Sequence, residues 1–289
     1  MKIVNSIEEV RSNIRQARAE GKTVGFVPTM GFLHEGHISL VNRSKSETSY
    51  QVMSIFVNRL QFNDLKDFTS YPKDMERDAD MAKNAGVDLL FVPDENEMYN
   101  NNLTSVNVER LTDHLCGAHR PGHFQGVFTV VSKLFNIIQP DVAVFGQKDI
   151  QQAVSIEKMV DDLNFPVRII IAPIMREVDG LAMSSRNKHL DAANRQNALV
   201  ISKSLRKAEQ MLIAGETHAG SVISAMKDVI LGGNPASIDY ISVVRYSDLS
   251  PVDTVTQKAV IAVAAFFGTT RLIDNMIVNL DKGSVECIY

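Results

Sequence analysis

Hydrophobic and polar positions alternate along the first 175 residues in the rhythm of strands followed by helices. Short apolar runs rich in β-branched residues predict buried strands, at 24–27, 51–57, 88–92, 142–145 and 167–172. Amphipathic stretches predict helices at 6–20, 38–46, 72–85, 127–138, and from the loop 146–149 to residue 160. This alternation predicts an α/β domain with a parallel sheet, helices on both faces, and ligand-binding residues at the carboxyl ends of the strands.

The pattern changes after residue 176. Two helices are expected at 191–214 and 219–231, and two strands at 238–244 and 259–266. The segment 271–275 is expected to lead into a final short strand. We therefore predict two domains, a parallel-sheet domain over residues 1–176 and a smaller α+β domain over residues 177–289.

The segment 24–37 has the pattern of a strand, a tight loop and a helix N-terminus. A glycine turn at Gly31 is followed by His34, Gly36 and His37, directly before the helix-like stretch 38–46. Unpaired backbone N–H groups and the partial positive charge of a helix N-terminus favour phosphate, and glycine allows a close approach of the main chain. The segment predicts a phosphate site with two imidazoles beside it.

Two other interpretations of these histidines are open. They could bind a metal, but the zinc-protease pattern needs His-Glu-x-x-His, and only Gly36 separates Glu35 from His37. Either histidine could instead cap the helix or lie on the surface.

Polar side chains collect where other predicted strands end. Each could belong to a solvated surface, but their recurrence at successive strand ends favours a binding site. A lysine near helix N–H groups suits phosphate, whereas glutamines suit hydroxyls or a carboxylate without adding charge. The residues are Asn58, Gln61, Lys148, Asp149, Gln151 and Gln152.

A glycine-containing loop over residues 173–187 follows the strand 167–172. It carries Ser184, Ser185 and Arg186, and the fork of an arginine suits phosphate oxygens. The loop could close over a triphosphate, or it could be an interdomain linker with an incidental arginine.

Composition limits the class of protein. The chain has 289 residues, 45% of them hydrophobic and 22% charged, and a net charge of −4 that argues against general nucleic-acid binding. Small-molecule partners are therefore expected. Cys116 and Cys287 have no metal-type spacing and suggest a reducing compartment. We see neither an apolar signal core nor a membrane-length apolar run, and we expect a cytoplasmic protein.

Taken together, the loops resemble those of one family. The motifs are Pro28-Thr29-Met30-Gly31, His34-x-Gly36-His37, Arg120-Pro121-Gly122-His123-Phe124, Gly146-x-Lys148-Asp149-x-Gln151-Gln152, Asp179-Gly180-Leu181-Ala182-x-Ser184-Ser185-Arg186-Asn187 and Arg271-Leu272-Ile273-Asp274-Asn275. They are similar to those of the pantothenate synthetases, the pantoate–β-alanine ligases of the HxGH nucleotidyltransferase superfamily.

The resemblance implies a Rossmann-like domain with a smaller C-terminal lid domain, usually in a homodimer. It implies a cytoplasmic ligase that makes pantothenate, a coenzyme A precursor. Pantoate attacks the α-phosphorus of Mg-ATP to give pantoyl adenylate and pyrophosphate, and β-alanine then displaces AMP. ATP and Mg²⁺ are thus expected, with no nucleic acid, no membrane and no protein-bound metal site.

Roles carry over from the family residue by residue. The catalytic residues implied are His37, His34, Lys148 and Arg186. The ATP-binding residues implied are Met30, Gly31, Phe32, Leu33, His34, Glu35, Gly36, His37, Gly146, Gln147, Lys148, Asp149, Met175, Met183, Ser184, Ser185 and Arg186. The residues implied to bind pantoate or β-alanine are Gln61 and Gln152, with Asn58 and Arg120 as weaker candidates and Tyr71 as a wall of the pocket.

One position departs from the family pattern. Phe-Val-Asn-Pro-x-Gln-Phe is usual, whereas this chain has Arg59 in place of the proline. Proline fixes φ and stiffens a loop, so arginine is expected to loosen the segment that bears Gln61 and to weaken pantoate binding.

Two rival functions share part of this pattern. Another adenylyltransferase of the HxGH type would keep His34, Gly36 and His37, but it should have a cationic acceptor pocket in place of Gln61 and Gln152. A nucleotide-binding protein without activity would bind ATP and show no turnover.

Overall fold

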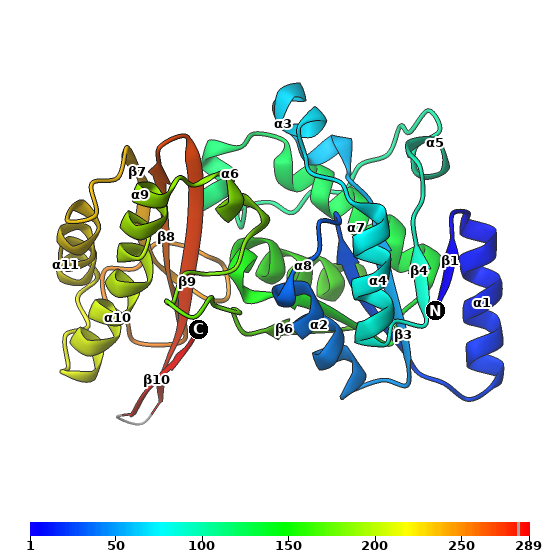
Figure 1. Cartoon of the computed structure of the whole chain (residues 1–289). Coiled ribbons are helices and arrows are strands. Elements are labelled where there is room, and N and C mark those ends of the chain that lie inside the picture. Colours follow the sequence, from blue (N-terminus) through cyan, green and yellow to red (C-terminus); the bar gives the residue numbers. More distant parts are fainter. Residues whose placement is uncertain (282–283) are drawn as a thin grey trace. The chain divides into compact units, whose positions relative to one another are not determined.

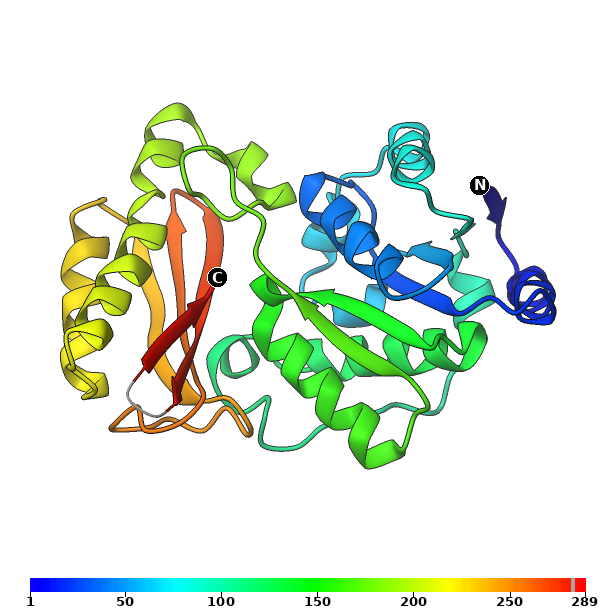
Figure 2. The ribbon, with the colours of Figure 1, turned by 90° about the horizontal axis from the view of Figure 1, so that it is seen from below.

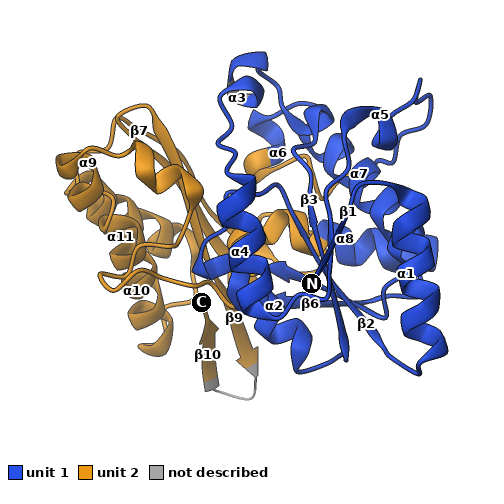
Figure 3. Ribbon diagram, turned by 45° about the vertical axis from the view of Figure 1, so that its right-hand side comes forward, with its two compact units in different colours: residues 1–109, 117–146, 155–172 blue, residues 110–116, 147–154, 173–289 orange. Residues whose placement is uncertain are grey.

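The computed structural model describes residues 1–281 and 284–289, and they form two compact units, blue and orange in Figure 3. Unit 1 comprises residues 1–109, 117–146 and 155–172. Unit 2 comprises residues 110–116, 147–154 and 173–289. The predicted domain boundary between residues 176 and 177 stays a prediction. Among the described residues, no helix has the length and apolar character needed to cross a membrane.

A parallel sheet lies at the centre of unit 1. Among the described residues it has six strands in the order β1-β4-β3-β2-β5-β6, and every neighbouring pair is parallel. The strands are β1 Lys2–Val4, β2 Val24–Thr29, β3 Tyr50–Ile55, β4 Leu89–Phe91, β5 Val142–Gly146 and β6 Arg168–Ala172. The predicted α/β fold class is confirmed.

Helices lie on both faces of this sheet (Figure 2). On one face α2 and α4 contact each other, and Leu40 and Ala82 pack against Val27 in a buried apolar cluster. On the other face α1 and α7 contact each other and β2. The helices that begin in this part of the chain are α1 Ile7–Ala19, α2 Glu35–Lys45, α3 Leu65–Thr69, α4 Met75–Ala85, α5 Glu95–Met98, α6 Leu115–His119, α7 His123–Ile138 and α8 Ile150–Leu163 (Figure 1).

The strand order changes direction between β2 and β5. From β2 the chain moves to β3 and β4 on one side, while β5 and β6 lie on the other. Ligands of open parallel sheets bind outside the carboxyl ends of strands at such a switch point. Because Thr29 lies opposite Ile55 in the register, the loops after β2 and β3 leave the sheet side by side.

The sheet of unit 2 is antiparallel, in the order β10-β9-β8-β7. Apolar residues of α10 and α11, including Leu205 and Val222, pack with Ile261 and Val263 of the sheet. The elements are α9 Ala192–Asn197, α10 Val200–Ile213, α11 Ala219–Leu231, β7 Ser237–Arg245, β8 Ala259–Phe267, β9 Thr270–Asp281 and β10 Ser284–Ile288. The predicted smaller α+β domain class is confirmed.

Several predicted boundaries were wrong. The helix expected at 38 begins at Glu35, because two histidine side chains cap its first turn. The helix expected at 127 begins at His123, after Gly122 in the left-handed conformation. The expected helix 191–214 is divided into α9 and α10, because Leu199 and Ile201 make tighter i→i−3 hydrogen bonds at the junction. At Ser6 and Glu9, the capping box of α1 is present.

Three strands differ from the prediction. Residues 271–275 lie inside the twelve-residue strand β9 and do not precede it. The edge strand β1 was not predicted, because three residues are too few to show a period. The edge strand β10 has five residues with the polar and apolar alternation typical of a strand, and this usable signal was missed.

Candidate active site

The loop after β2 bends through two residues with left-handed backbone. Gly31 has φ +84° and Phe32 has φ +51°. The hydroxyl of Thr29 accepts a hydrogen bond from the Gly31 N–H at 3.2 Å and donates to Ser54 O at 2.8 Å. A left-handed conformation is uncommon for phenylalanine, so surrounding contacts must stabilise this turn.

Asp78 of α4 provides those contacts. Its carboxylate accepts hydrogen bonds from the Phe32 N–H at 2.6 Å and the Leu33 N–H at 2.7 Å, and the residue is 1% exposed. The Arg77 guanidinium lies 5.3 Å from the Phe32 ring centroid. Two adjacent N–H groups that no regular element satisfies are thus paired with one buried carboxylate.

His34 and His37 cap the first turn of α2 reciprocally. Nδ1 of His34 accepts from the Gly36 N–H at 3.1 Å, and Nδ1 of His37 accepts from the His34 N–H at 3.2 Å. The ring centroids lie 4.1 Å apart. A ring nitrogen that accepts a hydrogen bond carries no proton, so each ring is in the neutral form with its proton on Nε2. The capping interpretation is therefore correct in part, and it leaves Nε2–H as the donor side of each ring.

The loop after β3 presents a pair of side-chain amides. Asn58 is 1% exposed, and its Nδ2 donates to Gln61 Oε1 at 3.0 Å. Its Oδ1 accepts from the Tyr99 hydroxyl at 2.8 Å. Burial raises the pKa of Tyr99 well above its ordinary value, so the hydroxyl keeps its proton for this hydrogen bond. Gln61 Nε2 donates to Met30 Sδ at 3.0 Å, which joins this loop to the loop after β2.

The start of α7 fixes the backbone of Gln61. The Gln61 carbonyl accepts from Nδ1 of His123 at 2.7 Å and from Arg120 at 3.4 Å. Gly126 lies against the 3₁₀ turn η1 (Arg59–Gln61), and a Cβ there would lie 2.3 Å from Leu60 O. The motif at residues 120–126 therefore supports the loop after β3.

Tyr71 and the unusual Arg59 lie around this loop. Tyr71 packs edge-on against Phe62, with ring centroids 5.9 Å apart. Arg59 opens η1, and its guanidinium pairs with Glu95 at 3.2 Å, where both side chains are more than half exposed.

The second group of candidates lies in unit 2. Lys148 follows β5 in the turn η2 (Gln147–Asp149), with its Nζ 3.7 Å from an Asp149 carboxylate oxygen. On the first turn of α8, Gln151 is buried and donates to Leu111 O and His114 O, whereas Gln152 is half-buried. Gln151 thus has a structural role, which leaves Gln152 as the glutamine suited to a ligand.

The loop over residues 173–187 folds back on itself. The Met183 N–H donates a hydrogen bond to Met175 O at 2.9 Å, and the backbones of Arg176 and Ala182 form an antiparallel β-bridge. Ser184 caps the turn η3 (Ser185–His189) by accepting from the Arg186 N–H at 3.2 Å. An ordered hairpin with an exposed arginine after it is unlike a simple linker.

Comparison with known proteins decides the family. A family model described as Pantoate-beta-alanine ligase matches residues 2–277. The chain belongs to the pantoate–β-alanine ligase family.

Curated relatives of this ligase match nearly the full length of the chain. The pantothenate synthetase of Thermoanaerobacter sp. (strain X514) is 51% identical over 278 residues, which are 96% of this chain and 98% of that protein. That of Caldicellulosiruptor saccharolyticus is 49% identical over 281 residues, which are 97% of this chain and 100% of that protein. The resemblance and the class of C–N bond-forming ligase are confirmed.

Solved structures agree with the fold of this ligase. A pantothenate synthetase structure from Thermus thermophilus matches with a TM-score of 0.90 and 42% identity, covering 95% of this chain and 98% of that one. A pantoate–β-alanine ligase from Francisella tularensis, described as complexed with "Beta-gamma ATP and Beta-alanine", matches with a TM-score of 0.77 and 34% identity, covering 95% and 97%.

The ligase candidates fall into two groups. Unit 1 contains Met30–His37, Asn58 and Gln61, and the contact between Met30 and Gln61 joins them. Unit 2 contains Gln152 and the candidates at 147–149, 175 and 183–186, while Gly146 ends β5 in unit 1. The convergence of both groups on one ATP stays a prediction. Within the described residues, no group of three or more His, Cys, Asp or Glu side chains could bind a metal.

Three functional positions were missed in the sequence. Asp78 shares the buried stripe of α4 with Ala82 and Ala85, and a carboxylate at such spacing was a usable signal. Gly126 lies two residues after the recognised motif Arg120–Phe124, and no role was predicted for it. Tyr99 lies 41 residues from Asn58, and no local pattern predicts that contact.

The role of Asp78 can be tested with Asp78→Asn. We expect the amide to accept at most one of the two N–H groups, which lowers the free energy of unfolding by about 1–3 kcal/mol. Because the loop after β2 loosens, kcat/KM for ATP should fall roughly 10- to 100-fold. Asp80→Asn, on the exposed side of the same helix, is the matched control. Equal ATP kinetics in the two variants would contradict the role.

The close packing at Gly126 can be tested with Gly126→Ala. The added methyl group displaces Leu60 and Gln61, which costs about 1–3 kcal/mol of stability and should raise the KM for pantoate more than that for ATP. Gln125→Ala, at the neighbouring exposed position of α7, is the control. An unchanged KM for pantoate in a folded Gly126→Ala protein would rule out this support of the substrate loop.

Proposed function

We propose that this chain catalyses the ATP-dependent condensation of (R)-pantoate with β-alanine to pantothenate. A pantoate carboxylate oxygen forms a bond to the α-phosphorus, the bond to the β-phosphate breaks, and pyrophosphate leaves. The β-alanine amine then forms a bond to the acyl carbon of pantoyl adenylate, loses a proton, and AMP leaves. Neither step needs a nucleophilic side chain, so positioning and charge stabilisation must supply the rate.

One observation carries this proposal. A histidine-capped helix N-terminus and an uncharged amide pair adjoin within unit 1, through the contact of Met30 with Gln61. Helix N-termini favour phosphate, and amides bind hydroxyls and carboxylates. A phosphate site next to a small hydroxy-acid site is what adenylation of pantoate requires.

In the first step, negative charge grows on the departing pyrophosphate. We assign His34 and His37 to the phosphates through their Nε2–H groups, which donate hydrogen bonds to the growing negative charge and keep their protons. Lys148 and Arg186 contribute full positive charges, and the arginine fork suits two phosphate oxygens at once. Mg²⁺ enters as part of the substrate Mg-ATP, coordinated by phosphate oxygens, as is usual for magnesium nucleotides.

Pantoate is assigned to the amides. Gln61 Nε2 donates to a thioether sulfur, which is a weak acceptor, so a hydroxyl or carboxylate oxygen of pantoate can replace it with gain. Asn58 keeps the orientation of the Gln61 amide, and Gln152 contributes a second amide. Gln61 also lies near the β-alanine position in this assignment.

The remaining nucleotide contacts follow the family pattern. We assign the adenosine part of ATP to the segments 146–149 and 183–186 and to Met175, with Asp149 near the ribose. Residues 177–289 are assigned as a smaller lid domain and residues 1–176 as the Rossmann-like domain. A homodimer in the cytoplasm is proposed, and the two free cysteines are consistent with a reducing compartment.

A different adenylyltransferase of the same superfamily is the alternative. An acceptor that carries its own phosphate needs cationic side chains in the acceptor pocket, whereas the side chain of Gln61 pairs with the neutral Asn58 and the nearby Arg120 donates to the Gln61 backbone carbonyl. Pyrophosphate release from Mg-ATP that depends on pantoate, followed by AMP and pantothenate when β-alanine is added, supports the ligase. ATP binding without turnover would identify an inactive nucleotide-binding protein.

The roles of His37 and Lys148 predict a large loss of rate. In the same assay, His37→Ala or Lys148→Ala should lower kcat roughly 10²- to 10³-fold, the usual effect of removing one preorganised charge-stabilising group. His218→Ala is the matched control for His37, because His218 caps α11 by the same use of Nδ1. Lys158→Ala is the control for Lys148. Losses no greater than in the controls would refute the roles.

The arginine at position 59 predicts a gain. Arg59→Pro should lower the KM for pantoate, because proline suits the first position of a helical turn and Asn58 is already extended, with φ −79° and ψ 107°, close to the conformation that a residue before proline favours. Glu95→Gln removes the ion pair of Arg59 without changing the backbone and serves as the control. An equal or higher KM in Arg59→Pro would show that the arginine does not weaken the site.

A further inference from the structure

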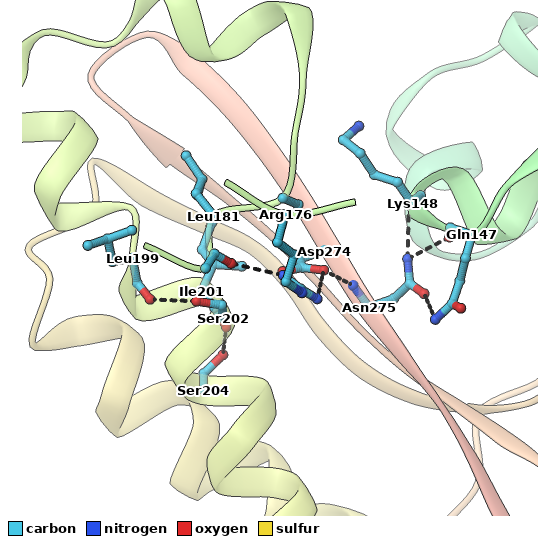
Figure 4. A network of polar contacts seen from close by, with 12 residues as sticks. Gln147, Lys148, Arg176, Leu181, Leu199, Ile201, Ser202, Ser204, Asp274 and Asn275 are labelled. Atoms are coloured by element: carbon cyan, nitrogen blue, oxygen red, sulfur yellow. Dashed lines mark hydrogen bonds and ion pairs between the residues drawn. The ribbon is translucent and has the colours of Figure 1, made fainter. Parts of the chain in front are cut away.

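Asp274 and Asn275 are adjacent, buried polar residues on β9. They are 2% and 1% exposed, and they end the motif 271–275, to which the proposed reaction assigns no role. Successive side chains of a strand point to opposite faces. Figure 4 shows that the two side chains accordingly reach different segments of unit 2.

Asn275 contacts the turn that carries Lys148. Its Nδ2 donates to Gln147 O at 2.9 Å and to Lys148 O at 3.0 Å. Its Oδ1 accepts from Gln147 Nε2 at 3.3 Å, and that nitrogen also donates to Ile288 O at 2.8 Å. One amide thus fixes two successive carbonyl groups and one side chain of the turn η2 (Figure 4).

The chemistry of these contacts is specific to a carboxamide of this length. Both hydrogens of the amide go to backbone carbonyls, and an aspartate of the same shape would have no hydrogen to donate. Asn275 therefore fixes Lys148 through its backbone carbonyl and does not contact the charged end of its side chain. The direction in which its ammonium group points depends on this anchoring.

Asp274 contacts the hairpin that precedes Ser184. Its carboxylate accepts from both terminal nitrogens of Arg176, at 2.7 and 3.0 Å, and from the Asn275 N–H at 2.8 Å. Arg176 also donates to Gly180 O at 3.1 Å, across the turn of the hairpin. Burial raises the pKa of Asp274, but three N–H donors favour the ionised form, so we describe the pair as a charged bidentate bridge.

We propose that Asp274 and Asn275 are positioning residues of the nucleotide site, Asn275 for Lys148 and Asp274 for the segment Met183–Arg186. The inference rests on the proposed function, because it takes Lys148 and Arg186 as contacts of the ATP phosphates. Neither of the two residues touches the substrate in this scheme. They act through the backbone that carries the charged groups.

A double-mutant cycle tests the part played by Asn275. Asn275→Ala should lower kcat/KM for ATP roughly 10- to 100-fold and leave the KM for pantoate within about threefold. In a Lys148→Ala background the same change should cost less than about threefold, because the group it positions is gone. Asn279→Ala, four residues further along β9, is the control and should not change the kinetics.

A purely structural role predicts other results. If Asn275 only stabilises the fold, the losses of Asn275→Ala and Lys148→Ala multiply, and the KM for pantoate rises together with that for ATP. Either result would overturn the proposal. If Asn275→Ala does not fold, Asn275→Ser, which has a single hydrogen to donate and no charge, replaces it in the cycle. Failure of both to fold would assign the residue to folding and overturn the proposal as well.

A second double-mutant cycle, with Arg186→Ala as the partner change, tests the role of Asp274. Asp274→Asn keeps the shape but removes the charge opposite Arg176, and it should lower kcat/KM for ATP about 10-fold or more, with little further loss in an Arg186→Ala background. Multiplying losses would remove Asp274 from the proposal.

Direct binding separates this inference from the proposed function. If the wild-type protein releases no pyrophosphate with pantoate and Mg-ATP, the proposed function is wrong, and the Kd of a non-hydrolysable ATP analogue replaces kcat/KM in both cycles. Weaker analogue binding in Asn275→Ala, absent in the Lys148→Ala background, still supports the positioning role. Unchanged binding overturns it.

Discussion

Buried side chains that satisfy irregular backbone are the constraint on which this structure depends. Parallel pairing brings the carboxyl ends of strands to one edge, but the loops that leave this edge have peptide groups that no ladder pairs. Asp78 accepts from two N–H groups of one loop, and Asn275 donates to two carbonyls of another. Each is at most 1% exposed, where an unpaired peptide group would cost about 1–3 kcal/mol. The loops can therefore be irregular and still have one conformation.

The histidines of the loop after β2 show that a structural and a functional role need not compete. Nδ1 of each ring caps α2, which fixes the tautomer and the direction of the ring. The same hydrogen bonds that stabilise the helix therefore determine which nitrogen carries the proton. A mobile surface histidine would lose rotamer freedom when it binds phosphate, and this loss would lower the binding free energy. The hydrogen bonds at Nδ1 already fix the rotamer and the tautomer of these two rings.

The sequence predicted what local chemistry determines. The strand and helix pattern predicted the parallel sheet and the first helix, whose local capping box at Ser6 and Glu9 is present in the structure. It failed where contacts distant in sequence decide. Hydrogen bonds with the Tyr99 hydroxyl and the Gly126 carbonyl, 41 and 68 residues away, orient Asn58. Arg176 and Asp274 form an ion pair although 98 residues separate them. Such pairs follow from the packing of whole elements, which periodicity does not encode.

The neutrality of the Asn58–Gln61 pair is itself an argument about the reaction. Pantoate must bring an anionic carboxylate toward an anionic triphosphate, so positive charge is most useful where charge grows, on the leaving pyrophosphate. A cation beside the pantoate carboxylate would stabilise the bound substrate and lower the nucleophilicity of its oxygen, which deepens the ground state without lowering the barrier. Amides bind the hydroxyls and orient the carboxylate without that penalty. The distribution of residues, with amides on the loop after β3 and histidine donors on the loop after β2, therefore suits adenylation of a small hydroxy acid better than transfer to a phosphorylated acceptor.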